Sequence, residues 1–174
     1  LEKEQVHYEN SIAKLKEQNR VDEAEALENQ LHEINRGLED VDYRAANVRA
    51  GYVYVISNIG SFGERMVKIG LTRRLDPMER VKELGDASVP FNFDVHVLHF
   101  SKDAVSVEAE LHRKFDDVKV NLVNSRREFF YATPAEVKSA LLEIDGSVLE
   151  YEEEAEADQF RQSASLRQQR VSKQ

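Results

Sequence analysis

The sequence predicts an α+β protein: a small domain with a mostly antiparallel central sheet flanked by helices, preceded by a long helical, coiled-coil-like arm. Three observations support this prediction. Residues 1–50 lack proline and carry an apolar heptad repeat, residues 51–143 alternate strand-like with helix-like segments, and residues 144–174 are acidic and polar. We therefore expect a helical arm, a compact domain, and a C-terminal tail that is disordered or loosely helical.

The arm is predicted from apolar residues that recur in alternating steps of four and three. These residues are Leu27, Leu31, Ile34, Leu38, Val41, Ala45 and Val48. Tyr8, Ile12 and Leu15 keep the same spacing upstream, but Asn19 and Asp22 interrupt it. Either a stutter in one helix or a turn between two helices explains the interruption. We expect the arm to lie on the domain or on a second copy of the chain; a solvated helical linker is the alternative.

The domain begins with a predicted hairpin. Residues 51–57 are β-branched and aromatic, a short glycine-bearing turn follows, and residues 66–70 form a second strand-like run. Two such runs across a short glycine turn are typical of a β-hairpin. Asp76 is then a predicted N-cap with Pro77 at the first helical position, and Gly85 should end that helix.

The second half of the domain continues the alternation. Residues 91–100 alternate apolar with polar side chains, which predicts a third strand. A helix starting at Ser101 or Asp103 is favoured by an apolar stripe of Val107, Leu111 and Phe115. Residues 128–131 are strand-like, and residues 133–136 form a capping box that leads a last helix through about Leu142.

Composition excludes several classes of protein. The chain contains no cysteine, which excludes disulfides, thiolate zinc sites and cysteine nucleophiles. Its apolar runs are far shorter than the ~18 residues that span a bilayer, so we expect a cytoplasmic protein, although the first residue is Leu and a membrane tether could precede it. The net charge of -9 divides into -5 in the arm, -1 in residues 51–143 and -3 in the tail. The acidity therefore does not exclude nucleic acid as a partner of the domain.

Candidate functional residues lie on the predicted hairpin. Phosphate-loop, dinucleotide-binding, zinc-protease and serine-hydrolase motifs are absent from the sequence. Tyr52 and Tyr54 share one face of the first strand, and Lys68 lies on the face of the second strand opposite to its apolar neighbours. A natural register makes Lys68 a neighbour of a tyrosine. The structural alternative is an ordinary Tyr-Lys pair on an exposed sheet.

Two helices carry further candidates. Glu108 and His112 are four residues apart, so they share a helix face beside the apolar stripe. A carboxylate at such a place suits Mg²⁺, whereas an exposed Glu-His pair is the alternative. Arg80 can grip a phosphate with its guanidinium, or it can be a surface arginine paired with Glu79 or Glu83.

Taken in order, these residues resemble the GIY-YIG endonuclease superfamily. Tyr52-Val53-Tyr54 stands where that family has Gly-Ile-Tyr, and Lys68-Ile69-Gly70 where it has Tyr-Ile-Gly. Arg80 and Glu108 stand at the places of its helix arginine and its metal-binding glutamate. Residues 68–72, 108–112 and 128–130 also resemble the Lys-Ile-Gly-x-Thr, E-x-x-L-H and Glu-[Phe/Trp]-Phe segments of one branch, the meiotically up-regulated gene type. The resemblance covers residues 51–133.

The resemblance implies a DNA endonuclease that uses Mg²⁺ or Mn²⁺ held by Glu108. It implies that the metal binds the scissile phosphate and stabilises the leaving 3′-oxygen. The implied proton acceptor is Tyr54, which takes a proton from water and has its pKa lowered by the metal or by Lys68. Arg80 would offset negative charge on the phosphoryl group, and Lys68 would orient water or phosphate in place of the usual Tyr. His112 would be a proton carrier or a phosphate contact, and Tyr52 is the remaining implied catalytic residue. The basic residues expected to contact DNA phosphates are Arg73, Arg74 and Arg127.

Two alternatives remain open from the sequence. Lys68 in place of the usual Tyr favours a DNA-binding module that has lost cleavage. The heptads favour a coiled-coil interaction protein that self-associates through residues 1–48. The arm also resembles the helical extension found before this nuclease type in bacterial and prophage proteins, which suggests a role in defence against phage or another role with mobile DNA.

Overall fold

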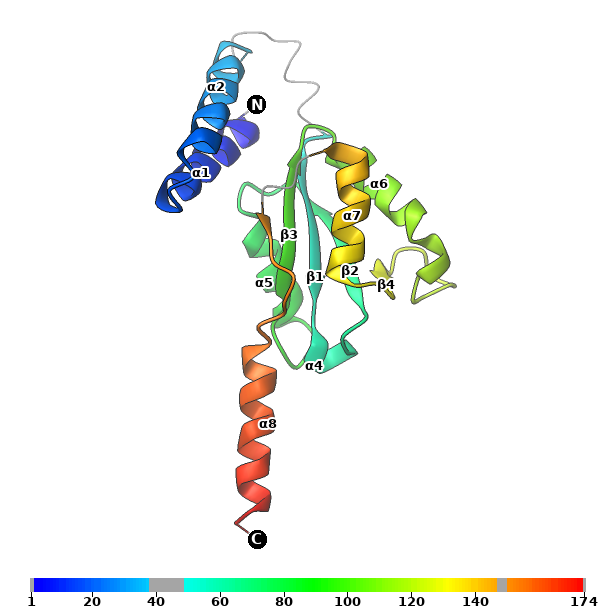
Figure 1. The fold of residues 1–174 in the computed structure, drawn as a ribbon. Helices are drawn as coiled ribbons and strands as arrows, with labels where there is room; N and C mark the ends of the chain where they lie inside the picture. Colours follow the sequence, from blue (N-terminus) through cyan, green and yellow to red (C-terminus); the bar gives the residue numbers. More distant parts are fainter. Residues whose placement is uncertain (1, 38–48, 147–149, 174) are drawn as a thin grey trace.

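The computed structural model, which describes residues 2–37, 49–146 and 150–173, confirms the α+β prediction (Figure 1). A five-stranded antiparallel sheet has the order β4-β2-β1-β3-β5. Its strands are β1 Gly51–Ser57, β2 Val67–Thr72, β3 Asp94–Ser101, β4 Phe129–Phe130 and β5 Glu150–Tyr151. The central strand β1 is buried along its whole length, because helices cover both faces of the sheet.

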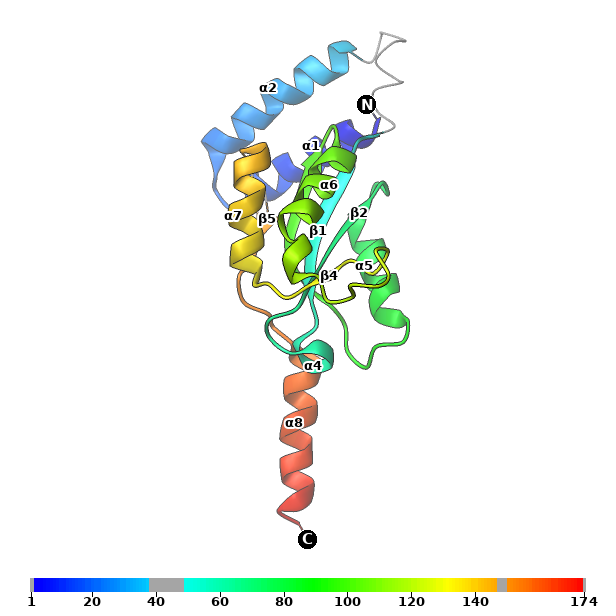
Figure 2. The same cartoon turned by 90° about the vertical axis from the view of Figure 1, so that its right-hand side faces the viewer.

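Three helices cover the sheet, and Figure 2 shows α5 on one side of it and α6 and α7 on the other. They are α5 Pro77–Asp86, α6 Ala104–Lys114 and α7 Pro134–Asp145. The alternation of β1 decides which side chains meet which helix. Val53 and Val55 pack in the main core with α6 and α7, whereas Tyr54 and Ile56 pack with Val81 of α5.

The predicted hairpin is present, with Tyr54 opposite Gly70 and Ile56 opposite Lys68. Its connection was predicted as a turn and contains a one-turn helix, α4 Ile59–Phe62. On the other edge of β1, the pairing with β3 shifts register between Val55 and Ile56. This shift is a β-bulge, a feature that the alternation of residues 91–100 does not reveal.

The helix starts agree with their capping signals. The Asp76 carboxylate accepts a hydrogen bond from the Met78 amide at 3.0 Å, and Asp103 caps α6. Thr133 and Glu136 form the reciprocal capping box of α7. One end was wrongly predicted: Gly85 lies inside α5, which continues to Asp86. A glycine is tolerated within a helix, so it is a weak stop signal by itself.

The arm is a pair of helices, α1 Glu2–Glu17 and α2 Val21–Gly37. A turn at residues 18–20, with Asn19 at a φ of 58°, separates them. Of the two explanations for the interrupted heptads, the turn is therefore correct. The two helices bury their stripes against each other through Ile12, Leu15, Ala24 and Leu27, with Tyr8 and Leu31 packed on this cluster. The predicted seam positions Leu38, Val41, Ala45 and Val48 lie outside the described residues.

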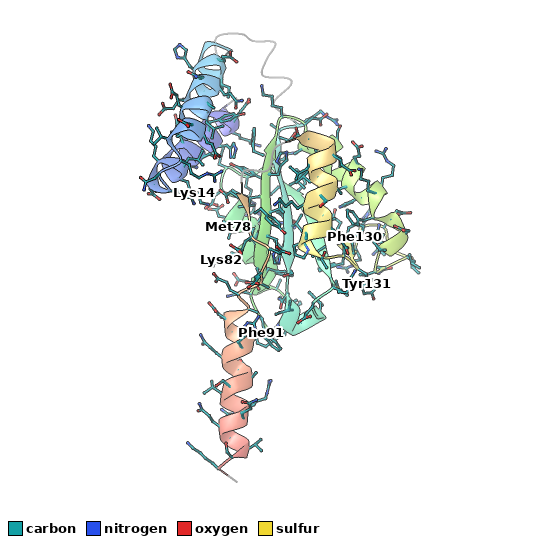
Figure 3. The ribbon with its side chains drawn as sticks, viewed as in Figure 1. Lys14, Met78, Lys82, Phe91, Phe130 and Tyr131 are labelled. Atoms are coloured by element: carbon teal, nitrogen blue, oxygen red, sulfur yellow. The ribbon has the colours of Figure 1, made fainter. Side chains whose placement is uncertain are left out.

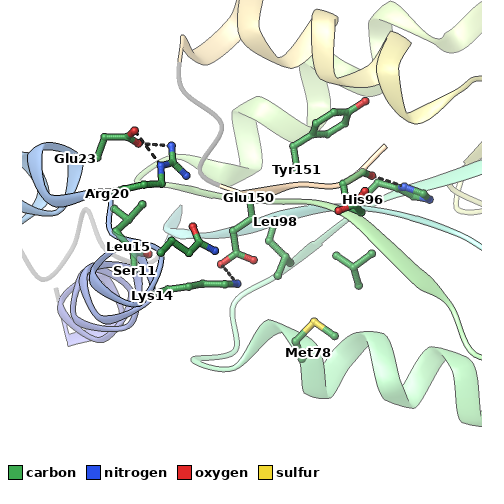
Figure 4. A pocket seen from close by; sticks show the side chains of 13 residues that line it. Ser11, Lys14, Leu15, Arg20, Glu23, Met78, His96, Leu98, Glu150 and Tyr151 are labelled. Carbon is green, nitrogen blue, oxygen red and sulfur yellow. Dashed lines mark hydrogen bonds and ion pairs between the residues drawn. The ribbon is translucent and has the colours of Figure 1, made fainter. Parts of the chain in front are cut away.

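Helix α1 docks on the domain at β1 and β3. The His7 ring stacks on Phe100, with ring centroids 4.5 Å apart, and His7 Nδ1 lies 2.6 Å from the Tyr52 hydroxyl. Lys14 forms an ion pair with Glu150 of β5 at 3.0 Å. Two cavities of about 410 and 450 Å³ open along this junction, and Figure 4 shows the first, beside that ion pair and Met78 of α5.

The C-terminal segment forms a strand and a helix. β5 pairs with β3, an addition to the sheet that the acidic composition of residues 144–174 did not predict. Helix α8 Asp158–Val171 has no buried residue and extends away from the sheet, at the end opposite the arm (Figure 1). The Phe160 ring packs edge-on against Phe91, with centroids 5.5 Å apart, at the base of this helix. Among the described residues, no helix combines the length and apolarity that a membrane span needs.

Candidate metal centre and active site

Three potential metal ligands converge at the edge of β2. Glu108 and His112 come from α6, and Glu128 directly precedes β4. Each offers a ligand atom within 4.8 Å of the others. Two features of the fold bring them together: α6 packs on β2, and β4 pairs with β2 at Val67 and Lys68. Glu128 was missed as a site residue from sequence, although it begins the Glu-Phe-Phe segment that the family resemblance uses.

His112 is anchored to the backbone of β2. Its Nε2 lies 2.8 Å from the Ile69 carbonyl oxygen. A carbonyl can only accept, so Nε2 carries the proton and Nδ1 is left as the free acceptor. The ring also packs against Phe130, with centroids 5.1 Å apart. The same Nε2 lies 3.9 Å from Glu108 Oε1, so His112 would have to give up its bond to Ile69 before this nitrogen could bind a cation.

The surroundings of Glu108 favour a bound cation. Burial, and after it the Glu128 carboxylate, raise the pKa of Glu108 to about 7, while Lys68 lowers it. Two carboxylates in a half-buried place repel each other, and a divalent cation between them offsets both charges. Mg²⁺ and Mn²⁺ prefer carboxylate oxygens and keep several water ligands. The donor set of Glu108 and Glu128, with His112 beside them, therefore fits the metal that the resemblance implies.

Lys68 contacts this cluster directly. Its ammonium lies 3.0 Å from Glu128 Oε2, and only 12% of the side chain is exposed. The same ammonium is 5.4 Å from the centroid of the Phe129 ring. Lys68 therefore neutralises one of the two carboxylates when no metal is bound.

Tyr54 lies on the α5 face of the sheet and is almost fully buried. Burial raises the pKa of Tyr54 to about 12, with further increases from Glu128 and Glu108, whereas the charge and hydrogen bond of Arg80 lower it. Without a metal, burial therefore outweighs the nearby positive charge, and a lowering of this pKa by the metal stays a prediction. The group that opposes the increase is Arg80 and not Lys68. The Tyr54 hydroxyl therefore lies beside Arg80 and within electrostatic reach of the two glutamates.

Gly70 makes the position of Tyr54 possible. It lies opposite Tyr54 in the hairpin, and a Cβ at Gly70 would approach the tyrosine ring and hydroxyl to 2.4 Å. Any side chain at Gly70 would displace Tyr54. The glycine of the Lys-Ile-Gly segment thus has a steric reason in this structure.

Arg80 has the acidic partner that the surface-arginine interpretation expects, and its role at a phosphate stays a prediction. Its guanidinium reaches Tyr54 and also lies 3.4 Å from Glu83. Glu83 is shared with Arg74, which binds it through both guanidinium nitrogens. Of the residues predicted to contact phosphate, Arg74 is therefore engaged in an ion pair. Arg73 and Arg127 are exposed, and Arg127 directly precedes Glu128.

Tyr52 is not brought to this cluster. It is 7% exposed, its hydroxyl is bound to His7 of the arm, and its ring packs against Phe100. Burial, and after it Glu150 and Asp76, raise its pKa above the usual range. The described contacts give Tyr52 a part in docking the arm, and its predicted catalytic part stays a prediction.

The position of these residues in the chain agrees with a known family. Residues 51–145 match the T5orf172 domain, and the match covers more than half of the 174 residues. The chain belongs to the T5orf172 domain family. The T5orf172 domain is a GIY-YIG-like, nuclease-associated domain, in agreement with the superfamily resemblance and with a nuclease-related, DNA-binding function. The match does not single out a branch, so the meiotically up-regulated gene type stays a prediction. No curated protein and no solved structure matches the chain.

Proposed function

We propose that this T5orf172 domain hydrolyses DNA phosphodiester bonds as a divalent-metal-dependent endonuclease. The observation that carries the proposal is the convergence of Glu108, His112 and Glu128 within 4.8 Å at one edge of the sheet. Lys68 and the Tyr54–Arg80 pair surround the same edge. Carboxylates, a phenol and two cations are the groups that phosphoryl transfer uses for metal binding, water positioning and charge stabilisation.

Glu108 and Glu128 would hold the metal, which when bound supplies Lewis-acid activation of a phosphoryl oxygen and stabilises the leaving 3′-oxygen. Tyr54 is protonated at neutral pH without the metal, so its hydroxyl first donates a hydrogen bond that orients water or phosphate. Positive charge from Arg80 lowers the cost of losing that proton to become a base. Arg80 also offsets charge that develops on the phosphoryl oxygens.

Lys68 and His112 have supporting parts in this proposal. Lys68, now paired with Glu128, would be free to contact a phosphate oxygen if Glu128 held the metal. His112, one helical turn from Glu108, would be a proton carrier or a phosphate contact, and its bond to the Ile69 carbonyl holds the ring in position. A role against phage or other mobile DNA stays a prediction from the sequence.

Replacing Glu108 by Gln tests the proposal. Glu108→Gln keeps the size of the side chain but removes a metal-binding charge, so we expect nicking of supercoiled plasmid with Mg²⁺ or Mn²⁺ to fall by at least about 100-fold. The matched control is Glu110→Gln on the same helix, outside the three-ligand cluster. Circular dichroism and thermal unfolding would check that both variants fold. Parental cleavage by a folded Glu108→Gln protein would refute the assignment.

The ion pair between Lys68 and Glu128 favours one second candidate, a DNA-binding module without cleavage. An ammonium 3.0 Å from a metal-binding carboxylate competes with a cation for that carboxylate. If the Lys68 ammonium stays on Glu128 and keeps the metal from binding there, the protein binds DNA but does not cleave it with Mg²⁺ or Mn²⁺. Binding measured by fluorescence anisotropy, beside the plasmid assay, separates the two functions.

A further inference from the structure

The loop at residues 121–127, between α6 and β4, presents the most exposed large apolar side chains among the described residues. Val123 is 98% exposed and Leu122 is 82% exposed. Covering two adjacent, fully exposed apolar side chains with a partner would be favourable. The fold thus has a feature that neither the core nor the metal centre explains.

This loop is held in shape by its own hydrogen bonds. The Asn121 side chain accepts hydrogen bonds from the amides of Val123 and Asn124, at 3.0 and 2.8 Å. The Asn124 side chain accepts one from the Arg126 amide, and Lys119 donates to the Ser125 carbonyl. The two apolar side chains are therefore presented on a supported tip, which lowers the entropy lost when a partner binds.

The base of the loop is tied to the sheet. The Val120 amide donates to the Phe129 carbonyl at 3.0 Å, and the Tyr131 amide donates to the Val118 carbonyl at 2.8 Å. The loop is thus the end of a short hairpin whose second limb is β4. Figure 3 labels Phe130 and Tyr131, where that limb reaches the sheet edge. The tip is therefore connected through the backbone to Glu128, which directly precedes β4.

The charges around the tip indicate which partner fits. Arg126 and Arg127 are exposed, and neither side chain takes part in an ion pair within the described ranges. Arg127 is directly followed by Glu128 of the metal cluster. Two apolar side chains followed by two arginines suit DNA, where apolar wedges enter between base pairs and arginines bind the flanking phosphates.

We propose that the 121–127 loop is a DNA wedge: Leu122 and Val123 insert into a base step of the minor groove, and Arg126 and Arg127 bind the phosphates beside it. The proposal rests on the proposed function for its partner, DNA. Val123 and Glu128 are five steps apart along the chain, so their Cα atoms are at most roughly 17 Å apart. The unstacked step therefore lies within about five base pairs of the cleaved bond. The wedge selects deformable steps and distorts the phosphate that meets the metal centre.

The experiment places 2-aminopurine at successive positions of a short duplex and follows its fluorescence with the full chain in Ca²⁺ or EDTA. We expect a several-fold increase at one or two positions, and its loss in Leu122→Ser/Val123→Ser. The matched control is Leu166→Ser/Val171→Ser, which changes the same residue types on the exposed helix α8. Thermal unfolding should be unchanged in both variants, because all four side chains are exposed. A second variant, Arg126→Ala/Arg127→Ala, removes two expected phosphate contacts. The slope of log binding constant against log salt concentration should therefore become shallower by about two.

The outcomes separate the wedge from the nuclease. Unstacking by the parent without any cleavage in Mg²⁺ or Mn²⁺ refutes the proposed nuclease function and supports the wedge. Cleavage without unstacking, or unstacking that survives in the Leu122/Val123 variant, refutes the wedge and leaves the nuclease intact. Failure of the parent to bind DNA overturns both. If the Leu122/Val123 variant changes the mass of the protein in solution, the tip is a contact between copies of the chain and the DNA assignment is wrong.

Discussion

At the scale of single residues, the site depends on two short contacts, one steric and one electrostatic. Tyr54 occupies the space that a side chain at Gly70 would fill, and Glu128 is shared between Lys68 and the metal cluster. Both features concern the same strand, β2. Substitutions at Gly70 and Lys68 therefore test the geometry and the electrostatics of the site separately.

The change Gly70→Ala should displace Tyr54, because the new methyl carbon would lie 2.4 Å from its ring. We expect a loss of about 1–3 kcal/mol in the free energy of unfolding, typical of overpacking, together with loss of cleavage. Urea unfolding and the plasmid assay measure the two effects. Gly85→Ala is the control, since its nearest neighbour would be at an ordinary 3.5 Å. A Gly70→Ala protein with parental stability would contradict the packing argument.

The change Lys68→Met removes the ammonium that competes for Glu128. We expect Mn²⁺, followed by electron paramagnetic resonance, to bind about tenfold more tightly, as the loss of one charge at this distance implies. Cleavage should nevertheless fall, because the ammonium that would contact a phosphate oxygen is then missing. Lys82→Met, on the exposed part of α5, is the control. Unchanged Mn²⁺ affinity would show that Lys68 and the metal do not share Glu128.

At the scale of elements, the junction between α1 and the sheet depends on a buried histidine. His7 is 5% exposed, stacks on Phe100 and contacts the Tyr52 hydroxyl. Burial, and after it the nearby His99, lower the pKa of His7 from 6.5 to about 4. The folded protein therefore keeps His7 neutral over a range of pH in which the unfolded chain binds a proton.

This difference predicts a loss of stability on acidification. Above pH 6.5 His7 is neutral in both states, and between 6.5 and 4 only the unfolded state takes up the proton. Stability should therefore fall through this range by up to about 3 kcal/mol and change no further from this group below pH 4. Urea unfolding at several pH values measures the effect.

His7→Gln should flatten that dependence, and the exposed His32→Gln should leave it unchanged. A residual slope is expected in His7→Gln, because burial also lowers the pKa of His96. If His7→Gln retains the full parental slope, the histidine is not the group that responds.

At the scale of the whole molecule, the packing of the arm argues against the predicted self-association. The described part of the apolar stripe is buried between α1 and α2, and α1 is docked on the sheet. Apolar surface that is already buried cannot drive association. We expect light scattering to give the mass of one chain, 20.0 kDa, independent of concentration. A dimer that is lost on removal of residues 1–48 would restore the coiled-coil hypothesis.

The sequence predicted most of the elements, because their signals are local. Capping residues gave the starts of α5, α6 and α7, and the alternation of β1 gave its two faces. The end of α5, the bulge in β1–β3 and strand β5 were not predicted. Each of them depends on what lies beside the segment in space, and a single glycine or a two-residue strand carries little signal of its own.

The sequence by itself determined the α+β class, the helical arm, the residue types of the site and the family to which the chain belongs. Tertiary structure decided which residues meet: Glu128 joins Glu108 and His112, Tyr54 joins Arg80, and Tyr52 joins His7 of the arm. The physical reason is that capping and periodicity act within a few residues of the chain. Ligand sets and shifted pKa values depend instead on pairing between distant strands, on helix packing against β2, and on burial, which arise only when the whole domain has folded.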